Sequence, residues 1–118
     1  MIKAAVLATA LLAAQIAGAQ APAPASEPPK NYDPAKADEG KRVYTQNCAR
    51  CHGLNMRVAS TAFFDLRKLK VDEKPRFLNS VRNGVRAMPA WGDNLKPEEY
   101  ELIWSYVMTT NVKANAGG

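Results

Sequence analysis

Histidine and cysteine are both scarce in this chain of 118 residues, which contains one His and two Cys. A structural zinc site needs four ligands, and the sequence offers no second cluster to complete one. A thioredoxin-like dithiol belongs in a strand-and-helix context, but no stretch shows the sustained apolar–polar alternation typical of strands. These absences disfavour both classes and predict an all-α fold.

Strong charge and long apolar runs are also lacking. The formal net charge is +5, and no aromatic-basic recognition motif accompanies it, so nothing indicates nucleic-acid binding. The apolar run Ala4–Ala17 is shorter than the roughly 20 residues that span a bilayer. The run follows the positively charged Lys3, and Ala17-Gly18-Ala19 matches the small-x-small pattern that signal peptidase cleaves. We expect export to the periplasm, cleavage after Ala19 and no stable membrane insertion; a retained N-terminal anchor is the alternative.

The remaining composition predicts one small domain. We assign residues 1–19 to a signal peptide, 20–32 to a flexible leader rich in Ala and Pro, 33–113 to the folded domain and 114–118 to a disordered tail. A domain of about 80 residues has marginal stability from its core alone. A bound group is therefore expected to supply part of the core.

Every Cys and the single His lie in one pentapeptide, Cys48-Ala49-Arg50-Cys51-His52. This pattern is typical of covalent haem attachment, in which the two thiols add across the vinyl groups as thioethers. His52, the next residue, is placed to ligate the iron on the proximal side. Gly53 lets the chain turn away without a Cβ beneath the ring. We predict one covalent haem c.

Met88 is the leading candidate for the distal axial ligand. It lies between Gly84 and Pro89, and Pro89 keeps it out of a helix. Met56 is too near His52 in sequence to reach the opposite face, and Met108 falls in an apolar helical stripe. An open sixth position is the alternative, and it would favour a haem peroxidase or gas sensor.

The chain between Asp33 and Asn111 resembles the class I c-type cytochromes, because Gly40 and Tyr44 precede the pentapeptide as in that family's first helix. The resemblance implies that the last helix crosses the first, with Ile103 and Tyr106 meeting Gly40 and Tyr44. It also implies a small fold of about three main helices around the haem.

Local signals place those helices. The first is expected over residues 38–47, and the second has Asp72 as its N-cap and closes at Asn83-Gly84. Its apolar face comprises Phe77, Leu78 and Val81. The last opens at residues 95–99, with Pro97 in its first turn, and has an apolar stripe of Tyr100, Ile103, Trp104 and Val107.

The segment from Asn83 to Glu99, with Asp65-Leu66-Arg67, is similar to periplasmic cytochromes that accept electrons from quinoprotein (PQQ-dependent) alcohol dehydrogenases. The resemblance implies a monomeric, non-enzymatic carrier of single electrons, with such a dehydrogenase as donor and an oxidase or another cytochrome as acceptor. A haem subunit permanently bound to a dehydrogenase is the alternative. Trp91 either donates to a propionate or shields the haem edge. The candidates for propionate pairing or docking are Arg50, Arg57, Arg82 and Arg86.

Overall fold

The structure is a computed structural model that describes residues 18–19, 21 and 30–117. The predicted signal peptide up to residue 17 and most of the leader lie outside the described residues. Within the described part, the chain is helical and has no strand, which confirms the predicted all-α class. No helix there is long and apolar enough to cross a membrane.

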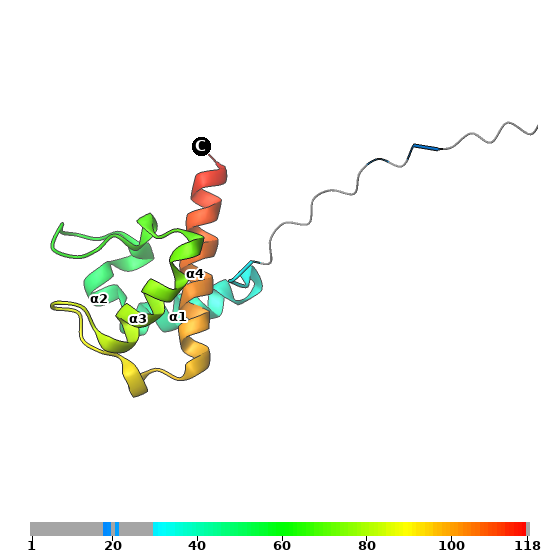
Figure 1. The fold of residues 1–118 in the computed structure, drawn as a ribbon. Coiled ribbons are helices and arrows are strands. Elements are labelled where there is room, and N and C mark those ends of the chain that lie inside the picture. Colours follow the sequence, from blue (N-terminus) through cyan, green and yellow to red (C-terminus); the bar gives the residue numbers. More distant parts are fainter. Residues whose placement is uncertain (1–17, 20, 22–29, 118) are drawn as a thin grey trace, which may run out of the picture.

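Over residues 30–117, the fold consists of four α-helices and five short 3₁₀ helices (Figure 1). The α-helices are α1 (Ala37–Asn47), α2 (Ala49–His52), α3 (Lys74–Asn83) and α4 (Pro97–Ala116). The 3₁₀ helices are η1 (Pro34–Lys36), η2 (Leu54–Met56), η3 (Leu66–Lys68), η4 (Val71–Glu73) and η5 (Gly92–Asn94). Three longer helices therefore form the scaffold, as the sequence predicts.

The crossing of α1 and α4 is the closest contact between helices. A Cβ added to Gly40 would overlap the Leu102 carbonyl oxygen, so only glycine permits this approach of the two backbones. Beside it, the rings of Tyr44 and Tyr106 pack with centroids 5.2 Å apart. The predicted crossing and the role of Tyr106 are confirmed, but the backbone against Gly40 belongs to Leu102 and not to Ile103.

Helix α4 is buried around most of its circumference. Its predicted apolar stripe is buried, and so are the intervening residues Leu102, Ser105, Tyr106, Met108 and Thr109. Trp104 packs against Phe77 of α3, with ring centroids 5.1 Å apart. The helix is central because α1, η1, η3 and α3 all contact it.

The N-terminal boundary of α3 corrects one prediction. Asp72 does not cap this helix; it lies inside η4, and the position before α3 is occupied by Glu73. Pro75 stands in the first turn of α3, where its missing N–H costs no hydrogen bond. The predicted end is confirmed, because Gly84 follows the last helical residue and donates its backbone N–H to the Ser80 carbonyl.

Residues just outside the predicted domain also join the fold. The Asn31 side chain donates to the Val71 carbonyl (2.7 Å) and accepts from the Trp104 indole N–H (3.2 Å). The backbone carbonyl of Asn31 accepts a hydrogen bond from the Lys74 ammonium at 2.9 Å. At the other end, α4 continues to Ala116, so residues 114–116 are helical where the sequence predicts a disordered tail.

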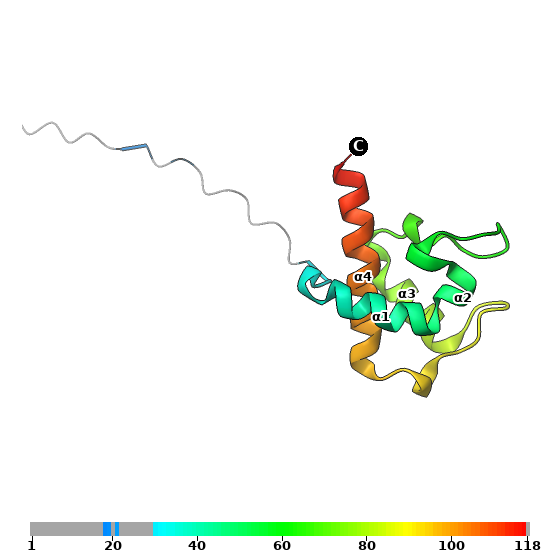
Figure 2. The same ribbon diagram turned by 180° about the vertical axis from the view of Figure 1, so that it is seen from behind.

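Two loops project from the same side of the molecule, one following α2 and one between α3 and α4 (Figures 1 and 2). The first comprises residues 57–65 and is drawn in green; the second comprises residues 84–91 and is drawn in yellow. Helix η1 lies on the opposite side of α4 in both views. The chain therefore enters the fold away from the two loops.

Candidate functional site

The two cysteines flank a single helical turn. Cys48 ends α1, and its carbonyl accepts hydrogen bonds from the backbone N–H groups of Cys51 (3.1 Å) and His52 (2.9 Å). The thiols are not joined in a disulfide; Cys48 is partly buried and Cys51 is exposed. Burial raises the pKa of the Cys48 thiol to about 12, and the nearby Cys51 adds to the shift. A thiol that stays protonated at neutral pH does not suit a dithiol nucleophile.

His52 is the last residue of α2, and its ring is fixed by the chain. Its Nδ1 lies 3.0 Å from the Phe64 carbonyl oxygen. A carbonyl can only accept a hydrogen bond, so Nδ1 is the donor, and in the neutral ring Nε2 keeps its lone pair. This is the arrangement that metal-ligating histidines adopt, because the second nitrogen orients the ring and raises its basicity. No sequence pattern marks Phe64, because its contribution is a backbone atom.

The turn after His52 is held by contacts to Gly53. Gly53 has a φ of 82°, and a Cβ there would overlap the Arg57 carbonyl, so glycine is required. The Gly53 carbonyl accepts a 2.7 Å hydrogen bond from the hydroxyl of Tyr44, which is fully buried in α1. Burial raises the pKa of the Tyr44 hydroxyl, so it remains a donor at neutral pH.

Met88 lies in the second loop, in a short hairpin. Its N–H donates to the Val85 carbonyl (2.9 Å), and its carbonyl accepts from the Val85 N–H (3.1 Å). The side chain is partly buried against the core. The structure therefore places Met88 outside a helix, as the sequence predicts.

The other two methionines near the site are core residues. Met56 is fully buried at the end of η2, and Met108 is 1% exposed in α4. Both belong to the main apolar cluster. The choice of Met88 as the distal ligand stays a prediction.

The other predicted contact residues are distributed around the loops. Trp91 is partly buried, and its backbone N–H donates to the Val81 carbonyl at 2.9 Å. Arg82 lies over the Tyr100 ring, 5.1 Å from its centroid. Arg50, Arg57 and Arg86 are exposed. A role of Trp91 or these arginines toward a propionate stays a prediction.

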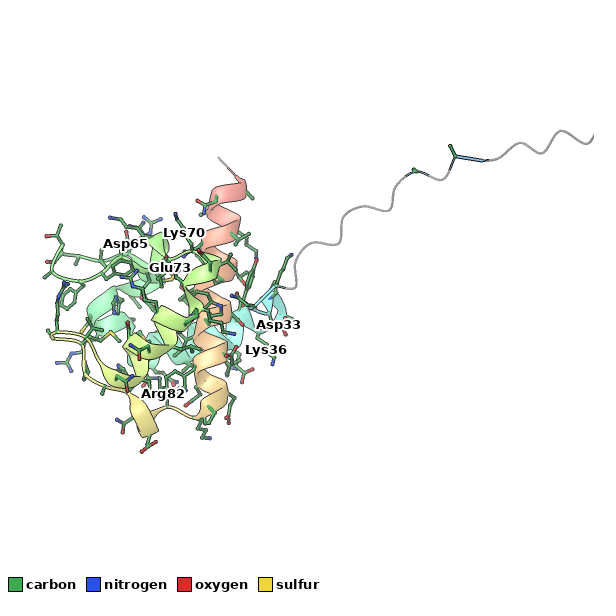
Figure 3. The ribbon with its side chains drawn as sticks, viewed as in Figure 1. Asp33, Lys36, Asp65, Lys70, Glu73 and Arg82 are labelled. Carbon is green, nitrogen blue, oxygen red and sulfur yellow. The ribbon has the colours of Figure 1, made fainter. Side chains whose placement is uncertain are left out.

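A set of polar contacts supports the segment after the first loop. Figure 3 shows Asp65, Lys70 and Glu73 close together at one end of α3 and Arg82 at the other end. Asp65 forms a bidentate pair with Arg67 (2.8 and 2.9 Å), and this hydrogen bonding lowers the pKa of its carboxyl. The pKa of Glu73 is also lowered, first by the Lys70 backbone N–H at 2.9 Å and then by the Arg76 guanidinium at 2.7 Å.

Comparison with known proteins decides the family. Residues 35–107 match the family model described as cytochrome C oxidase, cbb3-type, subunit III. The chain is 36% identical to cytochrome c6 of Anabaena variabilis over 78 residues, which cover 63% of this chain and 91% of that protein. For cytochrome c6 of Nostoc sp., the identity is 35% over 78 residues, or 63% of this chain and 70% of that protein.

The chain is a class I c-type cytochrome. As a member of that family it carries covalently bound haem c. The cytochrome is also 34% identical over 102 residues, or 77% of its length, to the quinohemoprotein alcohol dehydrogenase ADH IIB of Pseudomonas putida. The match covers 15% of that dehydrogenase.

The residues of this cytochrome fit the group that the family carries. A macrocycle is largely apolar, and four large apolar side chains near the two loops are exposed by 39 to 66%: Leu54, Phe63, Phe64 and Val85. A hollow of about 500 Å³ is lined by residues 58–65, Lys68 and Arg86, so both loops border it. Neither cysteine, nor His52 or Met88, lines this hollow.

Charge is distributed unevenly in the cytochrome. Residues 48–88, which include the first loop and the second loop up to Met88, contain nine Lys or Arg and three Asp or Glu, a net charge of +6. The remaining residues of 30–117 contain six basic and seven acidic residues, a net charge of −1. The segment that contains the candidate ligands is therefore the basic part of the described chain.

Proposed function

We propose that this cytochrome transfers single electrons through one haem, attached by thioethers to Cys48 and Cys51 and ligated axially by His52 and Met88. The observation that carries the proposal is the hydrogen bond from His52 Nδ1 to the Phe64 carbonyl, which leaves Nε2 available as a ligand beside the turn that contains both thiols. A disulfide or thiolate role would not need an oriented imidazole.

Each side chain then has a defined task. The bound haem supplies a reversible one-electron change between Fe(II) and Fe(III). The Phe64 carbonyl holds the His52 ring in one tautomer and one orientation. The Met88 thioether would hold the iron at the position where oxygen or peroxide could otherwise bind, and His/Met ligation would raise the reduction potential. These roles favour electron transfer over catalysis.

The positive charge of residues 48–88 supports docking at the two loops. A net charge of +6 on residues 48–88 steers a partner with an acidic surface toward the exposed loop residues. We propose a periplasmic monomer whose donor is a quinoprotein alcohol dehydrogenase and whose acceptor is an oxidase or another cytochrome. The similarity to the haem-containing dehydrogenase of Pseudomonas putida supports this choice of donor.

Absorption spectroscopy of the exported, purified protein tests the ligand set. We expect a low-spin c-type spectrum with the weak far-red Met–iron band, only slow binding of carbon monoxide after reduction, and loss of the band in Met88→Ala. Met108→Leu is the matched control, because that thioether is 1% exposed in the core, and its spectrum should match the wild type. A high-spin spectrum that shifts with carbon monoxide would instead favour a peroxidase or sensor.

A permanently bound haem subunit is the second candidate. It is favoured by the comparisons, since the matched family model is described as an oxidase subunit and the similar dehydrogenase is a larger protein that contains the matched segment. Size-exclusion chromatography of periplasmic extract separates the two. A haem signal at the volume of a monomer supports the shuttle, whereas co-elution with a dehydrogenase at high salt supports the subunit.

A further inference from the structure

The segment that contains Met88 is attached to the scaffold at two levels. Its hairpin is closed by the backbone pair of Val85 and Met88, as described above. Beyond the hairpin, the Trp91 N–H donates to the Val81 carbonyl, and the Trp91 carbonyl accepts from the Asn94 N–H at 2.6 Å. These are backbone bonds to α3 and within η5, and none of them reaches α4.

Tyr100 provides the side-chain connection to α4. It lies near the start of that helix and is 3% exposed. Its hydroxyl donates a 2.6 Å hydrogen bond to the carbonyl of Gly92, four residues after Met88. Helix α4 is fixed by its crossing with α1, so this bond ties the ligand loop to the most constrained part of the molecule.

Arg82 holds the Tyr100 ring in the direction that this bond needs. Its guanidinium lies over the ring, 5.1 Å from the centroid, within the range of a cation–π interaction. Arg82 belongs to the last turn of α3, directly before the loop. The ring of Tyr100 thus contacts the helix before the loop, and its hydroxyl contacts Gly92, the first residue after the loop.

We propose that Tyr100 is a positioning residue for the distal ligand, whose hydroxyl fixes the Gly92 carbonyl and thereby holds Met88 at the iron. The proposal rests on the proposed function, since it requires Met88 to be a ligand. Loss of the hydroxyl leaves the partly buried Gly92 carbonyl without this donor. A shift of the loop that exposes the carbonyl to water then becomes more favourable. Release of Met88 should then become easier while the fold is retained.

The test compares Tyr100→Phe with Tyr106→Phe in the haem-loaded protein. Both variants remove one hydroxyl from a buried tyrosine of α4, but the Tyr106 ring packs against Tyr44 and not against the loop. We would measure the rate of carbon monoxide binding to the reduced protein, the far-red band as temperature rises, and the free energy of unfolding. The first two report Met88 release, and the third reports overall stability.

For Tyr100→Phe we expect carbon monoxide to bind about three to ten times faster than to the wild type, since one hydrogen bond contributes about that factor to an equilibrium. The far-red band should disappear at a lower temperature. Tyr106→Phe should match the wild type in both measurements. Arg82→Gln should shift them in the same direction by a smaller factor, and Arg82→Lys should restore most of the difference.

The proposal is overturned if Tyr100→Phe lowers only the free energy of unfolding, or if both phenylalanine variants change carbon monoxide binding equally. A wild-type protein that lacks the far-red band and binds carbon monoxide rapidly would instead contradict the proposed ligation itself. The two failures are therefore distinguishable.

Discussion

The crossing of α1 and α4 and the pair of loops around the candidate ligands are built in different ways. At the crossing, glycine permits backbone contact, and the large side chain of Tyr44 is fully buried against Tyr106. In the loops, Phe63, Phe64 and Val85 remain exposed, and the chain is held mainly by hydrogen bonds to individual carbonyls. Changes at the crossing should therefore act on folding, and changes in the loops should act on the ligands and the potential.

The largest effect is expected at the crossing. Gly40→Val would place side-chain atoms on the Leu102 carbonyl and force the helices apart. We expect a loss of more than about 4 kcal/mol in the free energy of unfolding, or failure to accumulate haem-loaded protein. Gly117→Ala is the control, since a Cβ there makes only an ordinary 3.7 Å contact with the Lys113 carbonyl, and its stability should match the wild type.

Removal of the distal ligand is expected to have the opposite profile. Met88→Ala should lower the reduction potential and open the iron to carbon monoxide, because the thioether that stabilises Fe(II) is lost. The far-ultraviolet circular dichroism should stay close to that of the wild type, because α1 and α4 do not depend on this side chain. A collapse of helical content in Met88→Ala would contradict the separation of the two regions.

Asn111 joins the two regions and should affect both. Its buried amide donates to the carbonyls of Leu66 (3.0 Å) and Leu69 (3.1 Å), and so ties α4 to the segment after the first loop. Asn111→Ala removes the amide donor from both carbonyls, although the Leu66 carbonyl keeps the Leu69 N–H at 3.2 Å, so we expect a loss of about 1–3 kcal/mol in denaturant unfolding. Thr110→Ala, which removes a local bond within α4, should cost less.

The smallest effect is a dependence of stability on acid pH. The pKa of Glu73 is lower in the folded state than in the unfolded chain, so its ionised form stabilises the fold above about pH 5 and this contribution is lost as pH falls further. Glu73→Gln should therefore be less stable than the wild type at pH 7, and the difference should narrow near pH 3. Asp72→Asn changes the exposed neighbouring carboxylate. If this variant showed the same loss of stability at pH 7 and the same narrowing near pH 3, the assignment to Glu73 would be wrong.

Local signals explain what could be predicted from the sequence. The ends of α3 and α4 follow from Gly84 and Pro97, and the pentapeptide at Cys48 determines the cofactor class. Asp72 was misassigned because a 3₁₀ turn precedes α3, and nothing in the local pattern separates the two kinds of turn.

Long-range contacts explain what could not be predicted. The Phe64 carbonyl that orients His52 and the Tyr100 hydroxyl on Gly92 depend on how distant segments meet. Asn31, which bonds Val71 and Trp104, lies in a stretch whose composition predicts a leader. Such partners need the three-dimensional fold to be found, because neither residue type nor spacing marks them.

The central claim is that electrons pass through the surface at the two loops, where the basic segment 48–88 lies. Stopped-flow oxidation of the reduced cytochrome tests this claim most directly. With the anion hexacyanoferrate(III), we predict complete, second-order reoxidation whose rate falls as salt rises. With a cationic cobalt(III) tris-phenanthroline complex, the rate should rise with salt. Rates limited by a slow first-order step, or the same salt dependence with both oxidants, would contradict the account.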